Sequence, residues 1–538
     1  MSTSTAHSRV FETPELSGAI CGVARRHTCT TLLRVSKSSF RVAAPFVWNN
    51  ITHVISLFKL IPGVNSPTSR VLVDDIVCST RLLMVDPTDI FATKALPPFA
   101  GADFSRWDVY APYVHSLAIH ASISASPWGT LVMRSKQQHL LPNLSSLTIR
   151  QDYRRDQITK ELMWLSVFLT PSLTLVHVQN PAMYTGGVSV WGISAFLNMV
   201  ATSCPQLQDI KLPDVSEETE GVDGEHYLLN LLYRPVTDSF LELSNLVTLS
   251  ADLWIFRGAS LEALGTLPHL RYLKLFSGDT MLHLPEPVSS SKKLFPALEH
   301  LYLENLGFNE AKLVLGHRFL IKNLVSLTLG LNYDRNTADD IHSVLLMLKD
   351  MNSLNKLHAH FTDIYDDDHN GVRPDGIILE VLSQLPLRTI RLDNMLFFNL
   401  SESNLGQIFP FLTELQIPLQ AVDMHQFRYF AAIPNLRYLA VAFRDSITIN
   451  QVIAEETIVC PSLNHLEITN QDCDSFDFEP THVKPIARYL LRLFPNLRAI
   501  SWGDGVEENP IGYQCFVLLN AHIEMSWERK NGGASITA

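Results

Sequence analysis

The stretch that decides the fold is FPALEHLYLEN, which runs from Phe295 to Asn305. It contains a proline followed by Leu298, Leu301 and Leu303, in the pattern P-x-L-x-x-L-x-L. Two leucines two residues apart project from the same face of a short β-strand, and the leucine three residues earlier closes the turn before it. One such strand cannot form a core, so the unit needs neighbours of its own kind.

The pattern recurs along the chain, with substitutions, and each copy starts with an apolar residue. These leading residues are Val114, Leu144, Leu173, Leu207, Leu246, Leu270, Leu298, Leu324, Leu354, Leu387, Leu412, Leu436, Leu463 and Leu497. Three of the linking segments have a helical pattern, at 188–203, 337–351 and 484–494. Strands that alternate with helices predict an α/β solenoid, in which a curved parallel sheet lies inside and helices lie outside.

The repeats over residues 113–505 resemble those of leucine-rich repeat proteins, whose units are about 20–29 residues long. The spacing here is 24 to 39 residues, so the longer copies carry insertions. A solenoid needs caps at both ends. We therefore predict a further five regions: a disordered N-terminus at 1–9, a helical domain at 10–51, a linking region and N-terminal cap of the solenoid at 52–112, a C-terminal cap at 506–530 and a tail at 531–538. Within 52–112 we expect strands at 71–73 and 82–85 and a loop at 97–112.

The helical domain at 10–51 is small and apolar. Leu16, Ile20 and Val23 follow Pro14 at helical spacing, and a second helical pattern further on is broken by Pro45. Two short helices of this kind are too small to be stable alone. We therefore expect them to pack against the solenoid, against a partner protein, or against both.

Three strings in this domain carry a family resemblance: Pro14-Glu15-Leu16, the sequence LLRVSK at 32–37, and AAPFVW at 43–48. They resemble the opening, middle and end of an F-box of the divergent kind that heads many fungal leucine-rich proteins. The stretch RRHTCTT at 25–31 departs from the acidic and leucine-rich residues usual there. The resemblance implies that the domain binds the Skp adaptor of cullin-RING ligases, through Pro14, Leu16, Ile20, Leu33, Val35, Phe40, Pro45, Val47 and Trp48. The alternative is a plain helical cap that shields the first repeat.

The residues between the repeat leucines predict a binding surface. When the leucines of a strand point inward, their neighbours point to the open face of the sheet. The candidate target-binding residues on this face are Tyr272, Lys274, Phe276, His300, Tyr302, Glu304, His358, His360, Arg391 and Asp393. Aromatic side chains and arginine often anchor protein partners. The alternative is that they are ordinary strand residues, because Tyr and Phe favour strands in any case.

Composition narrows the class of partner and the compartment. The 538 residues carry a net charge of −12 with no basic tract, which argues against nucleic acid or an anionic membrane as the main partner. No apolar run is long enough for a membrane helix, and the N-terminus has no signal-peptide pattern. The seven cysteines form no C-x-x-C pair, which favours a reducing cytoplasmic or nuclear location. Cys204 and Cys460 each precede the proline of a repeat, so we expect both to be buried.

No sequence motif indicates catalysis, a cofactor or a metal. The nucleotide-binding, metalloprotease and serine-hydrolase motifs are missing, so we expect no enzymatic activity and no cofactor. The stretch from Asp366 to Gly371 matches part of an EF-hand loop, but Ile377 replaces the glutamate that calcium needs. His358 and His360 with Asp363 supply too few ligands for a structural zinc site.

These observations predict a substrate-recognition subunit of a Skp–cullin–F-box ubiquitin ligase. The adaptor would bind the N-terminal helices, and a target protein would bind the repeats. The alternative is a leucine-rich repeat scaffold or binding protein with no role in a ligase.

Overall fold

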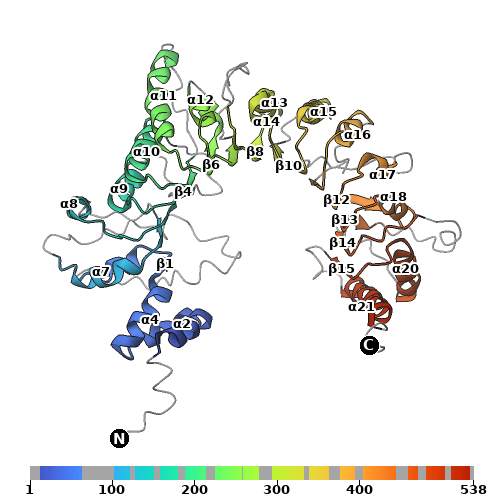
Figure 1. The fold of residues 1–538 in the computed structure, drawn as a ribbon, viewed down its shortest axis with the longest axis horizontal. Coiled ribbons are helices and arrows are strands. Elements are labelled where there is room, and N and C mark those ends of the chain that lie inside the picture. Colours follow the sequence, from blue (N-terminus) through green and yellow to red (C-terminus); the bar gives the residue numbers. More distant parts are fainter. Residues whose placement is uncertain are drawn as a thin grey trace, which may run out of the picture. The chain divides into compact units, whose positions relative to one another are not determined.

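The computed structural model divides the chain into two compact units (Figure 1). The first unit is built from the described residues up to Leu270, and the second from Arg271 onward. The structure describes residues 13–62, 102–120, 128–150, 158–179, 188, 190–213, 225–256, 259–277, 294–332, 338–362, 376–393, 404–443, 458–469, 480–502 and 510–532. The strands expected at 71–73 and 82–85 and the stretch 366–371 lie outside these residues.

The described residues contain fifteen β-strands, and those of each unit pair in parallel in chain order. The first unit contains β1 (Asn50–Ile51), β2 (Ser116–His120), β3 (Ser146–Arg150), β4 (Leu175–Gln179), β5 (Asp209–Lys211) and β6 (Thr248–Asp252). The second unit contains β7 (Tyr272–Phe276), β8 (His300–Leu306), β9 (Ser326–Asn332), β10 (Lys356–Thr362), β11 (Thr389–Asp393), β12 (Glu414–Val422), β13 (Tyr438–Phe443), β14 (His465–Thr469) and β15 (Ala499–Trp502).

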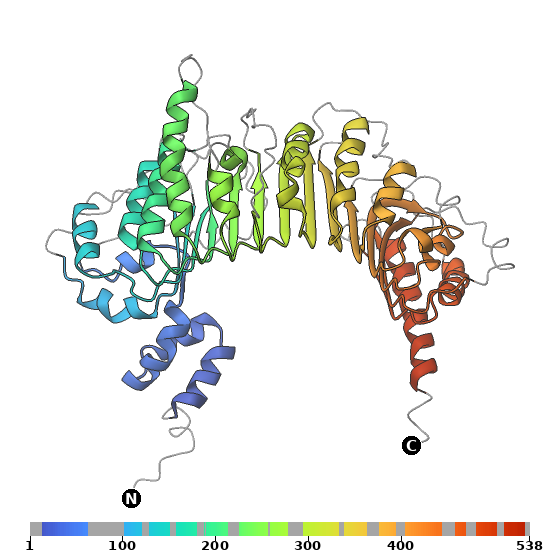
Figure 2. The same ribbon diagram turned by 45° about the horizontal axis from the view of Figure 1, so that its top comes forward.

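Helices lie between most successive strands of the chain and along one face of the strands in each unit (Figure 2). The first unit contains α2 (Pro14–Val23), α3 (Arg26–Leu32), α4 (Lys37–Trp48), α5 (Ile55–Phe58), α7 (Ser105–Tyr110), η2 (Ala111–Tyr113), α8 (Trp128–Gln137), α9 (Ile158–Phe168), α10 (Val190–Ser203), α11 (Glu225–Glu242), η3 (Leu253–Phe256) and α12 (Ser260–Gly265). The second unit contains α13 (Phe308–Gly316), α14 (Arg318–Ile321), α15 (Ala338–Leu346), η4 (Met347–Asp350), α16 (Gly376–Ser383), α17 (Leu405–Ile408), α18 (Phe427–Ala431), α20 (Pro480–Leu493) and α21 (Pro510–Gly532). None of these helices is both long and apolar enough to cross a membrane.

The strand register confirms the leucine pattern. Every one of the fourteen leading residues is buried and lies two positions before a strand, from Val114 before β2 to Leu497 before β15. In β8, Leu301 and Leu303 are fully buried and stand beside the equivalent leucines of β7 and β9. The leucines of each unit thus form rows beneath the helices, and the fold is an α/β leucine-rich repeat solenoid, as the sequence predicts.

Side chains in the turns link each repeat to the one before it. The residue preceding a leading leucine donates a hydrogen bond to the proline carbonyl of the preceding turn, at 2.7–2.8 Å in three successive turns of the second unit. The linked pairs are Asn435–Pro410, Ser462–Pro434 and Asn496–Pro461. The proline of the P-x-L motif therefore serves two purposes, because it bends the chain and offers its carbonyl to the next copy.

The N-terminal helices form a three-helix unit, α2 to α4, which we call the N-terminal module. The sequence predicted two helices; the third, α3, arises within the RRHTCTT stretch. Its core is built from small side chains: Cys21, Cys29, Ala43 and Val47. Pro45 does not break α4, as we had expected, but lies inside it. It removes one backbone hydrogen bond, to the carbonyl of Arg41, and Arg41 is exposed to solvent, which can replace the lost donor.

Aromatic rings attach the N-terminal module to the start of the solenoid. The Trp48 ring lies 4.6 Å from that of Tyr110, and Phe40 contacts Tyr110 and Tyr113 edge to face at 5.5 and 6.5 Å between ring centroids. Directly after α4, Ile51 enters β1 and pairs with β2. The module is therefore joined both by packing and by the first strand of the sheet.

Residues 105–110 were expected in a loop but form α7. Asp103 lies just before this helix, and its carboxylate accepts a hydrogen bond from the Ser105 amide at 2.8 Å, which satisfies one donor of the first turn. Trp107 is fully buried, and its indole N–H donates to the Leu140 carbonyl at 2.9 Å. The helix thus belongs to the cap of the first repeats.

The C-terminal helix α21 closes the last strand. The Asn520 side chain accepts a hydrogen bond from the Ile500 amide of β15 at 2.9 Å, where a further strand would otherwise pair. Arg498 lies over the Trp527 ring at 5.0 Å. The helix extends from Pro510 to Gly532, two residues beyond the predicted cap at 506–530.

We expect Leu301→Ala to lower the free energy of unfolding by about 2–5 kcal/mol, because the leucine is fully buried and its removal leaves a cavity. The matched control is Lys322→Ala in the neighbouring turn, which is exposed and should cost less than about 0.5 kcal/mol. Urea unfolding measures both values. Hydrogen exchange should show the loss first in β7 to β9, because repeats are coupled mainly to their neighbours. If both variants lower the free energy of unfolding by the same small amount, the assignment of buried and exposed positions in this repeat is wrong.

Candidate protein-binding surfaces

The open face of the second unit carries two rows of polar and aromatic side chains that run across its strands. On β7 to β10, one row consists of Tyr272, His300, Ser326 and Lys356. The other row consists of Lys274, Tyr302, Thr328 and His358. Each residue is in register with its neighbour on the next strand. Eight of the ten predicted target-binding residues are half-buried or exposed, so most of the predicted surface is open.

Phe276 and Asp393 depart from this expectation, because each is only 9% exposed. Phe276 stands in register with Glu304, but its ring is packed within the protein and is not free to contact a partner. Asp393 is buried beneath the side chains of its neighbours. Both are therefore structural residues of the surface and not contact residues.

The Asp393 cluster consists of Asp393, Arg391, His358 and His360, from β10 and β11. Arg391 Nε donates to both carboxylate oxygens of Asp393, at 2.9 and 3.1 Å. His358 Nε2 lies 2.9 Å from Oδ2 and donates to it, because an ionised carboxylate can only accept. His360 Nδ1 is further away, at 3.8 Å. The carboxylate thus fixes the orientation of an arginine and of a histidine at once.

The environment lowers the pKa of Asp393. Burial alone would raise the pKa, since it disfavours the charged form. The hydrogen bonds from His358 and Arg391, with the positive charge of Arg391, outweigh burial and hold the pKa below its usual value. The cluster therefore contains an ionised carboxylate at neutral pH.

On β7 and β8 the charged side chains pair with one another. Lys274 Nζ lies 2.6 Å from Glu304 Oε1, and Arg271 contacts Glu299 at 2.5 Å. The His300 ring stacks on Tyr272 at 4.3 Å between centroids. Burial lowers the pKa of His300, which favours the neutral ring in this stack. This end of the surface is therefore balanced in charge and already satisfied by its own contacts.

Sequence analysis missed a second group of side chains on the same face, on β13 and β14. The Tyr438 hydroxyl donates to Glu467, and the Tyr438 ring stacks on His465 at 5.2 Å. His465 Nε2 lies 2.7 Å from Ser501 Oγ. Burial, followed by the contact with Glu467, raises the pKa of Tyr438. The outward-pointing residues of the strand that follows Leu463 would have predicted this group from the sequence.

The N-terminal module presents a large apolar face to solvent. On α2, Leu16, Ile20 and Val23 are 50%, 38% and 89% exposed, whereas Ser17 and Cys21 are buried. The helix thus turns its small side chains inward and its large ones outward. Val35 and Phe46 add to the exposed apolar side chains of the module.

The nine predicted adaptor-binding residues fall into three groups. Pro14, Leu16, Ile20 and Val35 are exposed, and Leu33, Phe40, Pro45 and Trp48 are half-buried. Val47 is buried in the core of the module and cannot contact a partner directly, in contrast to our expectation. Phe40 and Trp48 lie against the solenoid. For the exposed residues, adaptor binding stays a prediction.

A pocket of about 540 Å³ lies where the N-terminal module meets the first repeats. Its apolar lining comes from Leu33, Phe40, Val109 and Tyr113, and its polar lining includes Arg34, Lys37 and Arg41. The three cations are exposed and make no ion pair among the described residues. The pocket is therefore positively charged although the chain as a whole is acidic.

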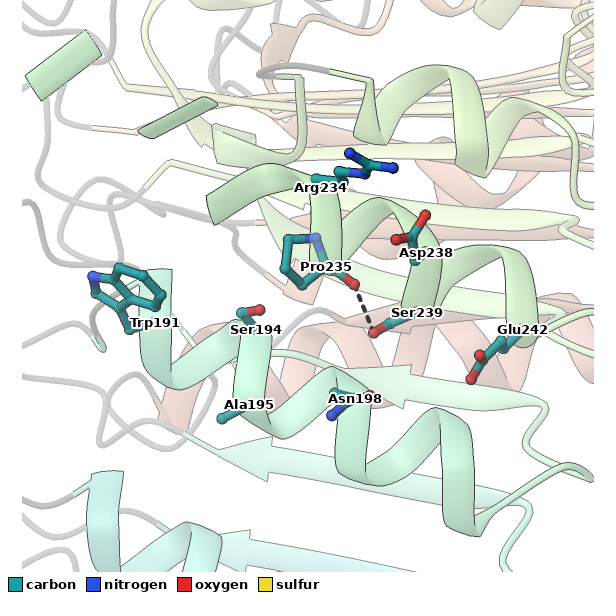
Figure 3. A pocket seen from close by; sticks show the side chains of 9 residues that line it. All are labelled: Trp191, Ser194, Ala195, Asn198, Arg234, Pro235, Asp238, Ser239 and Glu242. Carbon is teal, nitrogen blue, oxygen red and sulfur yellow. Dashed lines mark hydrogen bonds between the residues drawn. The ribbon is translucent and has the colours of Figure 1, made fainter. Parts of the chain in front are cut away.

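A groove of about 480 Å³ runs between α10 and α11 on the helical side of the first unit (Figure 3). Trp191 marks one end and is 66% exposed, and Arg234, Asp238 and Glu242 follow along α11. Sequence analysis did not identify this groove. The sequence feature that could have predicted the groove is Trp191, a large apolar residue that lies outside the apolar stripe of its helix.

The described cysteines and acidic side chains show no metal-binding arrangement. Cys204 and Cys460 are fully buried free thiols, as the sequence predicted, and burial raises the pKa of Cys204 to about 12. Among the residues that the structure describes, no group of three or more His, Cys, Asp or Glu side chains is placed to hold a metal ion. His358 is bound to Asp393, and Asp363 lies outside the described residues.

No protein family and no curated protein matches the sequence. Among solved structures, the chain is similar to one in "Crystal structure of TLR13-ssRNA13 complex", with 14% sequence identity and a TM-score of 0.28. The similarity covers 67% of this chain and 58% of that chain, so this chain spans less than two thirds of its neighbour. The assignment as a leucine-rich repeat solenoid depends on the strand register and the buried leucines, and not on this similarity.

We expect the contribution of Asp393 to stability to depend on pH. Its pKa is lower in the folded chain than the value of about 3.9 for an unfolded Asp, so the ionised form stabilises the fold above about pH 4. The stabilisation is lost as the pH falls through the folded pKa. The native chain should therefore be more stable than Asp393→Asn at about pH 5 and above, and this difference in unfolding free energy should shrink below about pH 4. Urea unfolding at each pH measures it, and a difference that does not change with pH contradicts the assigned ion pair.

Proposed function

We propose that the chain is the substrate-recognition subunit of a Skp–cullin–F-box ubiquitin ligase. In this proposal the N-terminal module binds the Skp adaptor and the leucine-rich repeats bind a target protein. The observation that carries the proposal is the outward apolar face of α2, formed by Leu16, Ile20 and Val23. The resemblance of the module to an F-box supplies the identity of the partner.

The orientation of α2 is what a docking helix requires. A helix that only capped the solenoid would turn its large apolar side chains inward, because burial of each stabilises by about 1.5–3 kcal/mol. Here Ser17 and Cys21 face the module and the larger side chains remain in water. A partner that covered this face would bury these apolar side chains and would thereby supply the stabilisation that they lack in water. Exposed apolar patches of this kind mark protein interfaces.

The module is also held in place, which a docking unit needs. The contacts of Trp48 and Phe40 with Tyr110 and Tyr113 fix it against the first repeats. These two residues therefore support adaptor binding indirectly, as positioning residues. A ligase subunit of this kind would catalyse nothing itself, and its contribution would be to bring the target close to the transferring enzyme in a productive orientation.

A second candidate is a leucine-rich repeat scaffold whose helical module binds no ligase. The observation in its favour is that α4 and β1 cover the start of the sheet, as any N-terminal cap would. The open face of the second unit would serve a scaffold equally well. Adaptor binding separates the two candidates.

We expect the purified full-length chain to bind the Skp adaptor with micromolar or tighter affinity. The double variant Leu16→Ala with Ile20→Ala should weaken binding at least tenfold, or about 1.4 kcal/mol, because it removes the outward apolar face. Its thermal stability should stay close to that of the native chain, since both side chains are exposed. Calorimetric titration measures the affinity.

The matched control is Met133→Ala on α8, which also removes an exposed apolar side chain and should leave adaptor binding unchanged. If the intact, folded chain shows no adaptor binding at micromolar concentration, the ligase proposal fails and the scaffold remains. If the double variant binds as tightly as the native chain, the adaptor does not use the α2 face.

A further inference from the structure

We infer that the Asp393 cluster binds a carboxylate side chain in an acidic, extended segment of the target protein, with Arg391 as the contacting residue and Asp393 as its positioning residue. This inference rests on the proposed function to the extent that the repeats bind a target protein. It specifies the chemistry of that target, which the proposed function leaves open.

The geometry of Arg391 leaves its recognition edge free. Its Nε is fully engaged with Asp393, at 2.9 and 3.1 Å, which fixes the plane of the guanidinium group. The two terminal nitrogens make no other hydrogen bond or ion pair among the described residues, and half of the side chain is exposed. They present parallel N–H donors, the arrangement that binds a carboxylate with two hydrogen bonds.

Asp393 orients the cluster without cancelling its attraction for an anion. Its side chain is only 12% exposed, and its oxygens are occupied by Arg391 and His358. The exposed groups above it are cationic or neutral: Arg391, His358, His360 and, on the same strand as the histidines, Lys356. An incoming carboxylate therefore meets the arginine before it meets the buried negative charge.

Further cations lie beside the cluster. Lys356 is exposed at the start of β10, in the same row as Ser326 of β9. On the other side, Arg388 precedes β11 and is exposed. The cationic area thus centres on β10 and β11.

The strand next to the cluster leaves room for a peptide backbone. Residues Ser326, Thr328 and Gly330 of β9 stand in register with Lys356, His358 and His360 of β10. All three β9 residues are small, whereas His300, Tyr302 and Glu304 of β8 on their other side are large. At Gly330 a Cβ atom would come within 3.3 Å of the Leu303 carbonyl, so the β8 backbone lies close beside this position. The small side chains beside the cationic residues are therefore those of Ser326 and Thr328, next to Lys356 and His358.

Acidic residues limit the cationic area on both sides, which favours a peptide over a nucleic acid. Glu304 lies on β8 and Glu414 on β12, and the chain as a whole has a net charge of −12. A nucleic acid would bring a line of phosphates across these carboxylates, and its affinity depends on neutralising several phosphates together. A segment with one or two carboxylates at the cluster avoids this repulsion.

The test uses the full-length chain and a short fluorescein-labelled peptide rich in Glu and Asp. Fluorescence anisotropy should show saturable binding that weakens with added salt, because the contact is charged and partly exposed. The same peptide with Gln and Asn in place of the acidic residues should bind at least tenfold more weakly. Equal binding of the two peptides would overturn the inference.

Substitutions assign the contact to Arg391. Arg391→Gln should weaken binding of the acidic peptide at least tenfold. Arg391→Lys should keep only part of the native affinity, because an ammonium group lacks the two parallel N–H donors of a guanidinium group. The matched control is Arg437→Gln, which removes an exposed arginine before β13 and should change binding less than twofold. Similar losses in both glutamine variants would show a diffuse charge effect and would contradict a specific site.

Asp393→Asn separates positioning from simple electrostatics. Removal of a negative charge would, by charge alone, strengthen the binding of an acidic peptide. If Asp393 positions Arg391, this variant should instead bind the acidic peptide several-fold more weakly than the native chain, while its far-UV circular dichroism stays unchanged. Stronger binding in this variant contradicts the positioning role.

The outcome is distinguishable from that of the proposed function. If the chain binds the adaptor but not the acidic peptide at millimolar concentration, this inference fails and the ligase proposal stands. If it binds the peptide through Arg391 but never the adaptor, the ligase proposal fails and the target chemistry stands for a scaffold. Free inorganic phosphate that displaces the peptide at concentrations where free glutamate does not would overturn the assignment to a carboxylate.

Discussion

The parallel pairing of one repeat with the next is the constraint on which the rest of the structure depends. At the turns within each unit, two successive amides donate to the same carbonyl of the preceding repeat, as Ser145 and Ser146 do with His115 at 2.8 and 2.9 Å. The strand that follows then places its two leucines beside those of its neighbour. No repeat could satisfy its backbone or bury its leucines alone, so each copy depends on the copies beside it.

This constraint explains why the fold could be predicted from the sequence and why the module surface could not. The leucine spacing specifies both the strand and the side that is buried, and every leading residue from Val114 to Leu497 is indeed buried. On α2, helical spacing grouped Leu16, Ile20 and Val23 on one face but did not reveal whether that face was inward. The direction of that face depends on the close packing of two small residues, Cys21 and Ala43. The spacing of apolar residues in the sequence does not reveal this packing. Likewise, α7 has a hydrogen bond from the Ser105 amide to Asp103 and the buried Trp107, neither of which the spacing of apolar residues revealed.

The candidate site shows the same division. The outward positions of the repeats predicted which residues share the open face, because register follows from the leucines. The sequence did not predict which charges neutralise one another. Lys274 is paired with Glu304, whereas Arg391 is paired through its Nε alone and keeps its outer edge. The burial of Asp393 decides this difference, and it depends on side chains from two strands 35 residues apart in sequence.

The hydrogen bond from the Ile500 amide to Asn520 has a consequence for how the chain behaves at high concentration. An exposed edge strand with unpaired amides is a template on which a second chain can add a strand, and a parallel repeat array would extend itself in this way into fibres. At β15 the side chain of α21 already occupies one of these donors. Asn520 thus blocks one of the donors through which a further strand could pair with β15.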